Sequence, residues 1–378
     1  MDLSSELIHA LLPLYMATVL GASALIIGIV EGVAEAIALF VKLFSGVLSD
    51  LFHRRKPLLL LGYGLAAASK LAFPLAPTLG WIAGARLADR IGKGIRGAPR
   101  DALIADITPP DVRGRSFGLR QALDTVGGVG GPLLALAGMA YFASDFRAVF
   151  WIAVVPALLA VVLIVVGVRE PAGARAVHRT PLRVGDLRRF APAVWFVAAI
   201  AGVLTLARFS EAFLVLRALD IGFSPASAPL VMVAMAIVYA VTAYPAGVAA
   251  DRGRVPHLLA FGLAALILSD LVLARAEGPA MVLAGAGLWG LHMGLTQGLL
   301  AALIAAVAPP DLRGTAFGVF NLVCGIALLI ASVLAGWLWD AYGPQFTFYA
   351  GAVFTVVAAI GLWLRRRELA LSSTISPW

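Results

Sequence analysis

The chain has 378 residues, of which 61% are hydrophobic and 13% are charged, and its formal net charge is +8. Soluble domains carry about 25% charged residues, so this sequence has roughly half the charge that a water-facing surface uses. The composition excludes an ordinary soluble domain and indicates a polytopic helical membrane protein. The basic residues outside the helices sit in a few short loops, which the positive-inside rule expects of a membrane protein, so no nucleic-acid partner is predicted.

Apolar segments of membrane-spanning length follow one another along the whole chain. The twelve predicted helices cover about residues 2–19, 22–48, 57–76, 79–107, 114–141, 146–168, 191–217, 224–249, 256–276, 279–307, 314–340 and 345–366. Every second connection is basic, and the connections between these are short and nearly neutral. The basic set is cytoplasmic by the positive-inside rule, which places the C-terminus inside. The expected location is the plasma (inner) membrane of a prokaryote, and the excess of Arg over Lys is typical of a GC-rich genome.

Two stretches of sequence recur at a nearly constant spacing. Residues 104–114 match residues 304–314 at an offset of 200, and residues 46–50 match residues 247–251 at an offset of 201. The repeat predicts an all-α membrane protein of two pseudo-twofold-related six-helix bundles, residues 1–168 and 191–366. An Arg/Pro-rich cytoplasmic linker, residues 169–190, would join them, and residues 367–378 would form a cytoplasmic tail. Secondary transporters are built on this plan, with the substrate site between the halves.

The same repeat predicts a first helix that is truncated at its N-terminus. Ser210 and Glu211 match Ser5 and Glu6 at an offset of 205, and the seventh segment begins near Ala191. By analogy the first segment should begin before Met1. Either the first helix is short and enters partway through the membrane, or the start lies upstream, and the offset favours an upstream start.

Residues 79–107 carry a row of basic side chains, which are Arg86, Arg90, Lys93, Arg96 and Arg100. At 100° per residue they fall within an arc of about 120°, one face of a single helix. A charge at the bilayer centre costs roughly 2.5–3.5 kcal/mol, so five that face lipid would cost on the order of 12–17 kcal/mol. The row must therefore face protein or water, and we expect it to form the wall of a cavity. It could equally neutralise buried acids on neighbouring helices.

Acidic residues of the first half supply the candidate proton site. Glu31 and Glu35 share a face of the second segment, Glu6 lies in the first, and Asp124 in the fifth. Our hypothesis is that one of these four carboxylates binds the proton, with an affinity set by the nearby cations of the fourth segment. A permanently paired polar network is the alternative. In the second half the expected substrate and proton pathway consists of Arg208, Glu211, His292, Gln297 and Asn321.

The loop after the second segment resembles the signature G-x-x-x-D-x-x-G-R-[RK] of the major facilitator superfamily, and the resemblance covers essentially the whole chain. His53 stands where glycine is usual, and the second copy is one residue shorter. The matching residues are Gly46, Asp50, Arg54 and Arg55, and in the second copy Gly247, Asp251, Arg252 and Arg254. The resemblance implies a cytoplasmic gate, in which a carboxylate at a helix end pairs with loop arginines and with a neighbouring helix N-terminus and separates when the halves move. A static salt bridge that fixes topology is the alternative.

Two further resemblances concern coupling and direction. The family's fourth-helix arginine, which is linked to proton coupling, corresponds to Arg86 when counted back from Asp106, or to Arg90. The fifth segment is similar to the G-x8-G-x3-G-P-x2-G-G signature of proton-coupled exporters, although its last glycine pair is missing. The matching residues are Gly118, Gly127, Gly131 and Pro132. Ordinary small-residue packing between helices is the alternative.

These observations predict a secondary active transporter that works by alternating access and exports a small molecule in exchange for protons. The row of cations suggests an anionic or zwitterionic substrate, although the acids could cancel that field. Alternatives are an importer, a metal-ion transporter that uses soft ligands such as His292 and Cys324, or a non-transporting receptor or assembly factor of the same fold. We expect no enzyme activity, no cofactor and no resident metal site. The expected partners are the substrate, protons and the lipid bilayer, and a monomer is expected.

Overall fold

The computed structural model describes residues 1–52, 55–109, 112–168, 189–309 and 312–364, and in these ranges it is helical with no strand. The helices are α1 (Asp2–Thr18), α2 (Ala24–Phe52), α3 (Lys56–Ala72), α4 (Leu79–Ile107), α5 (Arg113–Tyr141), α6 (Phe146–Gly167), α7 (Pro192–Ala207), α8 (Ala212–Asp220), α9 (Leu230–Asp251), α10 (Val255–Ala274), α11 (Pro279–Val307), α12 (Arg313–Tyr342) and α13 (Pro344–Leu364). Among the described residues, eight helical spans are long and apolar enough to cross a membrane. The predicted all-α membrane fold is confirmed.

The seventh predicted helix, residues 191–217, is not continuous, and this expectation was wrong. It is broken between Ala207 and Ala212 into α7 and α8, which together make one span, Pro192–Asp220. Ser210 satisfies backbone groups at the break: its hydroxyl accepts from the Ala212 N–H at 3.3 Å, and its own N–H donates to the Ser332 hydroxyl at 3.3 Å. No water is available inside a bilayer, so the backbone N–H groups left unpaired at a break need partners from the protein. The Ser210 and Ser332 hydroxyls supply them here.

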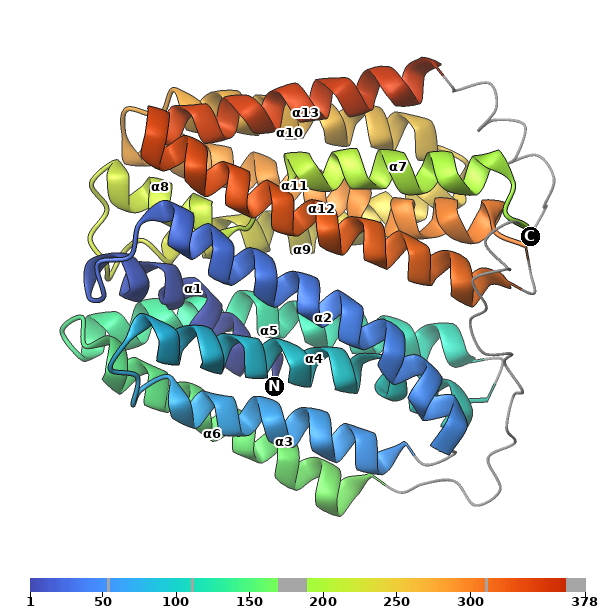
Figure 1. Ribbon diagram of the computed structural model, residues 1–378, viewed down its shortest axis with the longest axis horizontal. Coiled ribbons are helices and arrows are strands. Elements are labelled where there is room, and N and C mark those ends of the chain that lie inside the picture. Colours follow the sequence, from blue (N-terminus) through green and yellow to red (C-terminus); the bar gives the residue numbers. More distant parts are fainter. Residues whose placement is uncertain (53–54, 110–111, 169–188, 310–311, 365–378) are drawn as a thin grey trace. The chain divides into compact units, whose positions relative to one another are not determined.

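The described chain forms two compact units, and they differ from the two sequence halves in two segments. One unit contains α1, α2 from Val33 onward and α3 to α6, together with Phe223–Val233. The other contains Ala24–Gly32 of α2, α7 and α8, α9 from Ala234 onward, and α10 to α13. In Figure 1 the helices of each unit run side by side. The predicted boundaries, 1–168 and 191–366, stay predictions, and the linker and tail lie almost entirely outside the described residues.

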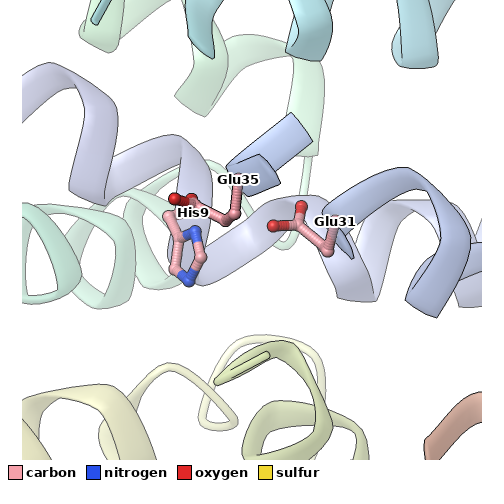
Figure 2. A group of neighbouring side chains, drawn as sticks. All are labelled: His9, Glu31 and Glu35. Carbon is pink, nitrogen blue, oxygen red and sulfur yellow. The ribbon is translucent and has the colours of Figure 1, made fainter. Parts of the chain in front are cut away.

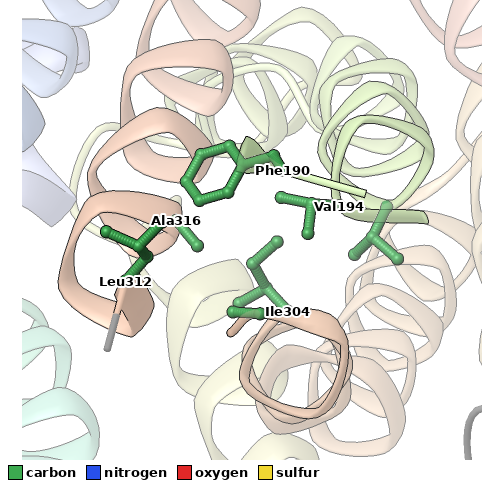
Figure 3. Close-up of a cluster of buried hydrophobic side chains, with 7 residues drawn as sticks. Phe190, Val194, Ile304, Leu312 and Ala316 are labelled. Carbon is green, nitrogen blue, oxygen red and sulfur yellow. The ribbon is translucent and has the colours of Figure 1, made fainter. Parts of the chain in front are cut away.

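The second unit has a core built around the start of α7. Phe190, Val194 and Val197 pack against α11 and α12 through a cluster that is completed by Ile304, Ala308, Leu312 and Ala316. Figure 3 shows the labelled members of this cluster, Phe190, Val194, Ile304, Leu312 and Ala316, facing one another. Apolar contact of this kind joins α7 to α11 and α12 in the second unit.

Small residues set how closely neighbouring helices approach, and they do so at repeated positions. A Cβ on Gly94 of α4 would lie 2.7 Å from Val41 Cβ on α2. A Cβ on Gly294 of α11 would lie 2.0 Å from the Thr242 hydroxyl on α9. The two glycines are 200 residues apart and their partners 201, which are the offsets of the sequence repeat. The same helix crossing is therefore built once in each unit.

Candidate functional site

The fourth helix places its basic row against the neighbouring helices of the first unit. α4 begins at the N-cap Thr78, whose side chain accepts from the Trp81 N–H. Its crossing with α3 is close, because a Cβ on Gly92 would lie 2.6 Å from the Gly62 carbonyl oxygen. Arg86, Arg90 and Arg96 are almost fully buried, with exposed fractions of 0%, 1% and 3%. These side chains point into protein, as the cost of exposing them to lipid requires.

A buried ion pair joins α3 to α4. The ammonium of Lys70 lies 2.8 Å from Asp89 Oδ1, and both side chains are shielded from solvent. The second carboxylate oxygen of Asp89 lies 3.9 Å from Arg86 and 3.9 Å from Arg90. The sequence analysis missed Lys70 and Asp89. Their signal was present, because a charge inside an apolar spanning segment needs a partner on a neighbouring helix.

Arg86 and Arg90 meet Glu35 of α2 on their other side. Glu35 Oε1 lies 3.2 Å from Arg90 Nε and 3.7 Å from Arg86 Nη2. Glu35 keeps 25% of its side chain exposed, whereas the two arginines are buried. Glu35 is therefore the member of this group that water reaches most readily. Glu35, one of the four predicted candidate carboxylates, thus lies within 4.0 Å of both arginines.

His9 of α1 completes this group. Its Nδ1 lies 2.7 Å from Arg86 Nη2. A guanidinium group can only donate hydrogen bonds, so His9 Nδ1 must accept, and the imidazole is the neutral tautomer with its proton on Nε2. Figure 2 shows His9 on α1 together with Glu35 and, one turn earlier on α2, the buried Glu31. We call His9, Glu35, Arg86 and Arg90 the α4 charge cluster.

The remaining cations of the row lie toward the C-terminal part of α4. Arg96 pairs with Asp2 at 3.2 Å and stacks over the Tyr63 ring at 4.9 Å. Arg100 lies 3.7 Å from Asp124 of α5, which also pairs with Arg120 at 3.0 Å. Lys93 differs from the others because it is exposed. Its ammonium forms no ion pair within 4.0 Å with a residue that the structure describes.

The glycines of α5 allow α1 to lie against it. A Cβ on Gly131 would lie 2.6 Å from Glu6 Cβ, and one on Gly127 would lie 3.0 Å from Asp2 Cβ. Pro132 is buried beside them. Gly118 has open space around its Cα, so it does not serve this contact. Close packing is thus the structural role of two of the three glycines in the exporter-like motif.

The candidate residues of the second unit come from the α7–α8 break, α11 and α12. Arg208 caps the end of α7 at the break, and Glu211 supplies the acidic charge that acts on it. His292 is buried on α11, with Nδ1 2.8 Å from the Gly262 carbonyl oxygen and Nε2 3.4 Å from the Thr296 hydroxyl. Both ring nitrogens are thus engaged by protein groups, which makes His292 a poor metal ligand. Gln297 is exposed and Asn321 is half-buried.

Another acid of the second unit, Asp270 on α10, was also missed. It is fully buried, and neither carboxylate oxygen has a hydrogen-bond partner among the described residues. It stands 200 positions after Lys70, so the repeat itself could have drawn attention to it.

The predicted gate residues are only partly described. The side chains of Gly46, Asp50, Arg54 and Asp251 lie outside the described residues. Arg55 is described and pairs with Asp106, at the end of α4, at 2.9 Å. In the second copy, Gly247, Arg252 and Arg254 are exposed.

Comparison with known proteins agrees with the fold and the internal repeat. The sequence model of the Major Facilitator Superfamily matches residues 1–216 and again residues 205–378. An MFS-type transporter of Methanocaldococcus jannaschii is 30% identical over 95% of this chain and 90% of its own length. The multidrug resistance protein MdtH of Salmonella arizonae is 27% identical over 85% of this chain and 79% of its own length.

Solved structures of the same architecture cover nearly the whole chain. A bacterial homologue of the human lysosomal transporter Spinster has a TM-score of 0.77 at 17% identity, over 98% of this chain and 95% of that one. The nucleoside transporter NupG has a TM-score of 0.79 at 15% identity, over 96% and 97%. The family is one of transporters and not of enzymes. The chain belongs to the major facilitator superfamily.

Proposed function

We propose that this transporter exports a small molecule in exchange for protons, and that the α4 charge cluster is the coupling site. The observation that carries the proposal is the contact of one partly exposed carboxylate, Glu35, with two buried arginines, Arg86 and Arg90. Protonation of Glu35 would remove one of the carboxylate charges beside these arginines and leave Asp89 as the other. Binding of a proton and reorganisation of the cluster are thereby the same event, which is what coupling needs.

The substrate class follows from the cations. Lys93 is exposed on the same helix and forms no ion pair with a described residue, so its ammonium is available to a ligand. We therefore infer a substrate with a carboxylate, phosphate or other anionic group, or a zwitterion.

Export is favoured over import by two features. The helix-5 glycines resemble those of proton-coupled exporters, and the relatives include MdtH, which is named a multidrug resistance protein.

Arg55 and Arg54 with Asp50 would form the cytoplasmic gate that the loop motif implies, and the basic loops would lie in the cytoplasm.

The test is flux through the purified protein in liposomes with an imposed pH gradient and a panel of anionic and zwitterionic ligands. For transporter molecules inserted inside-out in the liposomes, we expect an acidic interior to drive uptake of the substrate. In Glu35→Gln, at unchanged protein level, this uptake should no longer depend on the pH gradient. Glu277→Gln, an exposed acid between α10 and α11, is the matched control. Unaltered coupling in Glu35→Gln would refute the role of the cluster. Flux in the opposite direction would identify an importer, and binding without flux would identify a receptor.

A further inference from the structure

Asp270 occupies an unusual position for an acidic residue. It lies in α10 with no exposed surface, and both carboxylate oxygens are buried without a hydrogen-bond donor among the described residues. A charge in such a place is strongly disfavoured unless it is paired, and the ordinary response of a carboxylate is to take up a proton.

The space around Asp270 is shaped to hold its carboxyl group. On α13, a Cβ at Gly351 would lie 2.7 Å from Asp270 Oδ2 and 3.1 Å from the ring of Phe209. Phe209 belongs to the break between α7 and α8 and packs on Trp289 and Phe348 at ring-centroid distances of 5.3 and 5.6 Å. The carboxyl group therefore lies against Gly351, which has no Cβ to crowd it, and Gly351 in turn lies against the Phe209 ring.

The charged groups on the surrounding elements have other partners. Arg217 of α8 donates to the backbone carbonyls of Leu273, Ala274 and Ala276 and pairs with Asp220. On α11, His292 contacts the Gly262 carbonyl oxygen. At the break, Glu211 supplies the acidic charge that acts on Arg208. Tyr349 of α13 packs against Phe346.

The equivalent place in the first unit shows what is missing. At the repeat offset of 200, Lys70 of the first unit corresponds to Asp270 of the second. Asp89, the partner of Lys70, corresponds to Trp289. The first unit therefore pairs the two positions as a cation and an acid 2.8 Å apart, whereas the same positions in the second unit hold an acid and a tryptophan. The ion pair is present once and its counterpart is a lone acid in an apolar setting.

We infer that Asp270 is a proton-binding site, neutral in this conformation, and that it gives up its proton only when α13 or the α7–α8 break moves away from it. The inference that Asp270 is protonated does not require that the protein couples transport to protons. Its use within the transport cycle rests on the proposed proton coupling, and would make Asp270 a second proton site beside the α4 charge cluster.

The test is infrared difference spectroscopy of the purified protein in lipid at neutral pH. We expect a stretching band of a protonated carboxyl group that is lost in Asp270→Asn, whose side chain has the shape of the neutral acid. Gly351→Ala should shift this band without removing it, because the added methyl group crowds Oδ2. Glu277→Gln is the control, since Glu277 is an exposed acid outside the helices and its replacement should leave the band in place.

The outcomes separate this proposal from the proposed function. A wild-type spectrum without a protonated-carboxyl band, a band that survives Asp270→Asn, or a carboxylate band at Asp270 that responds to added sodium would each overturn it. The wild-type measurement decides even if a variant fails to fold. Flux in liposomes is then measured with the same variants: loss of gradient dependence in Asp270→Asn supports a place in the cycle, and a band without any such loss confines Asp270 to a structural proton site.

Discussion

At the scale of single residues, the Lys70–Asp89 pair makes the sharpest stability prediction. Both partners are buried and 2.8 Å apart. Removing one partner of a buried pair leaves the other uncompensated and costs about 3–5 kcal/mol. We expect Lys70→Met to lower the free energy of unfolding by about that amount, measured by thermal or denaturant unfolding in detergent.

The double variant Lys70→Met/Asp89→Asn separates the pair from general packing. It removes both charges, so it should recover part of the stability that the single variant loses. Arg275→Met, an exposed cation after α10, is the matched control and should change little. Equal losses in the single and double variants would contradict a specific ion pair.

Sequence reasoning found one side of the charged site and missed the other. The helical wheel placed Arg86 and Arg90 on one face, Glu35 was one of four candidate acids, and the structure joins these three residues. It did not find Lys70 or Asp89, because a wheel sorts charges on their own helix. Which acid meets which base depends on how helices cross, and the close Gly62–Gly92 crossing of α3 and α4 sets this contact.

At the scale of elements, the α1–α5 crossing depends on Gly131. A Cβ there would lie 2.6 Å from Glu6 Cβ and 2.7 Å from the Leu7 backbone nitrogen. Gly131→Ala should therefore destabilise the protein by about 1–3 kcal/mol through overpacking. Gly118 on the same helix has open space, so Gly118→Ala should be neutral or stabilise by up to about 1 kcal/mol. Thermal unfolding of the two variants side by side checks this, and equal effects would argue against the crossing.

A carboxylate of α12 caps the start of α2. The Asp340 carboxylate accepts from the Ala24 N–H at 3.1 Å and from the Leu25 N–H at 2.9 Å. Gly336, one turn earlier, lets the two helices touch, because its Cβ would lie 2.6 Å from Leu25 Cα. Two hydrogen bonds to the Asp340 carboxylate and the close approach at Gly336 thereby hold the first turn of α2 against α12.

This cap predicts an effect that an ordinary cap would not have. Asp340→Ala should cost about 1 kcal/mol, and so should Asp145→Ala, which removes the cap of α6. Asp145 is local to its own helix, whereas Asp340 ties two helices together. We expect only Asp340→Ala to change the rate of exchange transport in liposomes. The same change in both variants would mean that Asp340 is no more than a helix cap.

The helix ends were largely predictable, and the break in the seventh span was not. Segment 79–107 was predicted from its apolar and basic pattern and is α4, Leu79–Ile107. The break at 208–211 contains no Pro or Gly to announce it. It relies on the Ser332 hydroxyl of α12, which accepts from the Ser210 N–H. Ser210 and Ser332 are 122 residues apart in the sequence, so a local sequence pattern cannot predict this contact.

At the scale of the whole molecule, the two repeated units share a close helix crossing but not the charged side chains. Both units repeat the glycine crossing of Gly94 with α2 and Gly294 with α9. The basic row of α4 has become Ala286, Gly290, Met293, Thr296 and Leu300 in α11. Packing requirements are the same in each unit and were kept, whereas the buried charges are concentrated in the first. We therefore expect variants that block proton coupling to lie mainly in the first unit, apart from Asp270.

The distribution of basic loops makes a prediction about how the whole chain is inserted. The loop of Arg252 and Arg254 should face the cytoplasm, and the loop of Glu277 the opposite side. Cys324 is the one cysteine in the sequence, so a Cys324→Ala background accepts single reporters. Glu277→Cys and Arg254→Cys both place the thiol at an exposed position.

A membrane-impermeant maleimide added to intact cells should label Glu277→Cys and leave Arg254→Cys unlabelled until the membrane is opened. Each variant reports on the other, because both sites are exposed in the same unit and differ only in the side of the membrane that they are expected to face. Labelling of Arg254→Cys from outside would reverse the predicted orientation, and with it the direction in which a proton gradient could drive export.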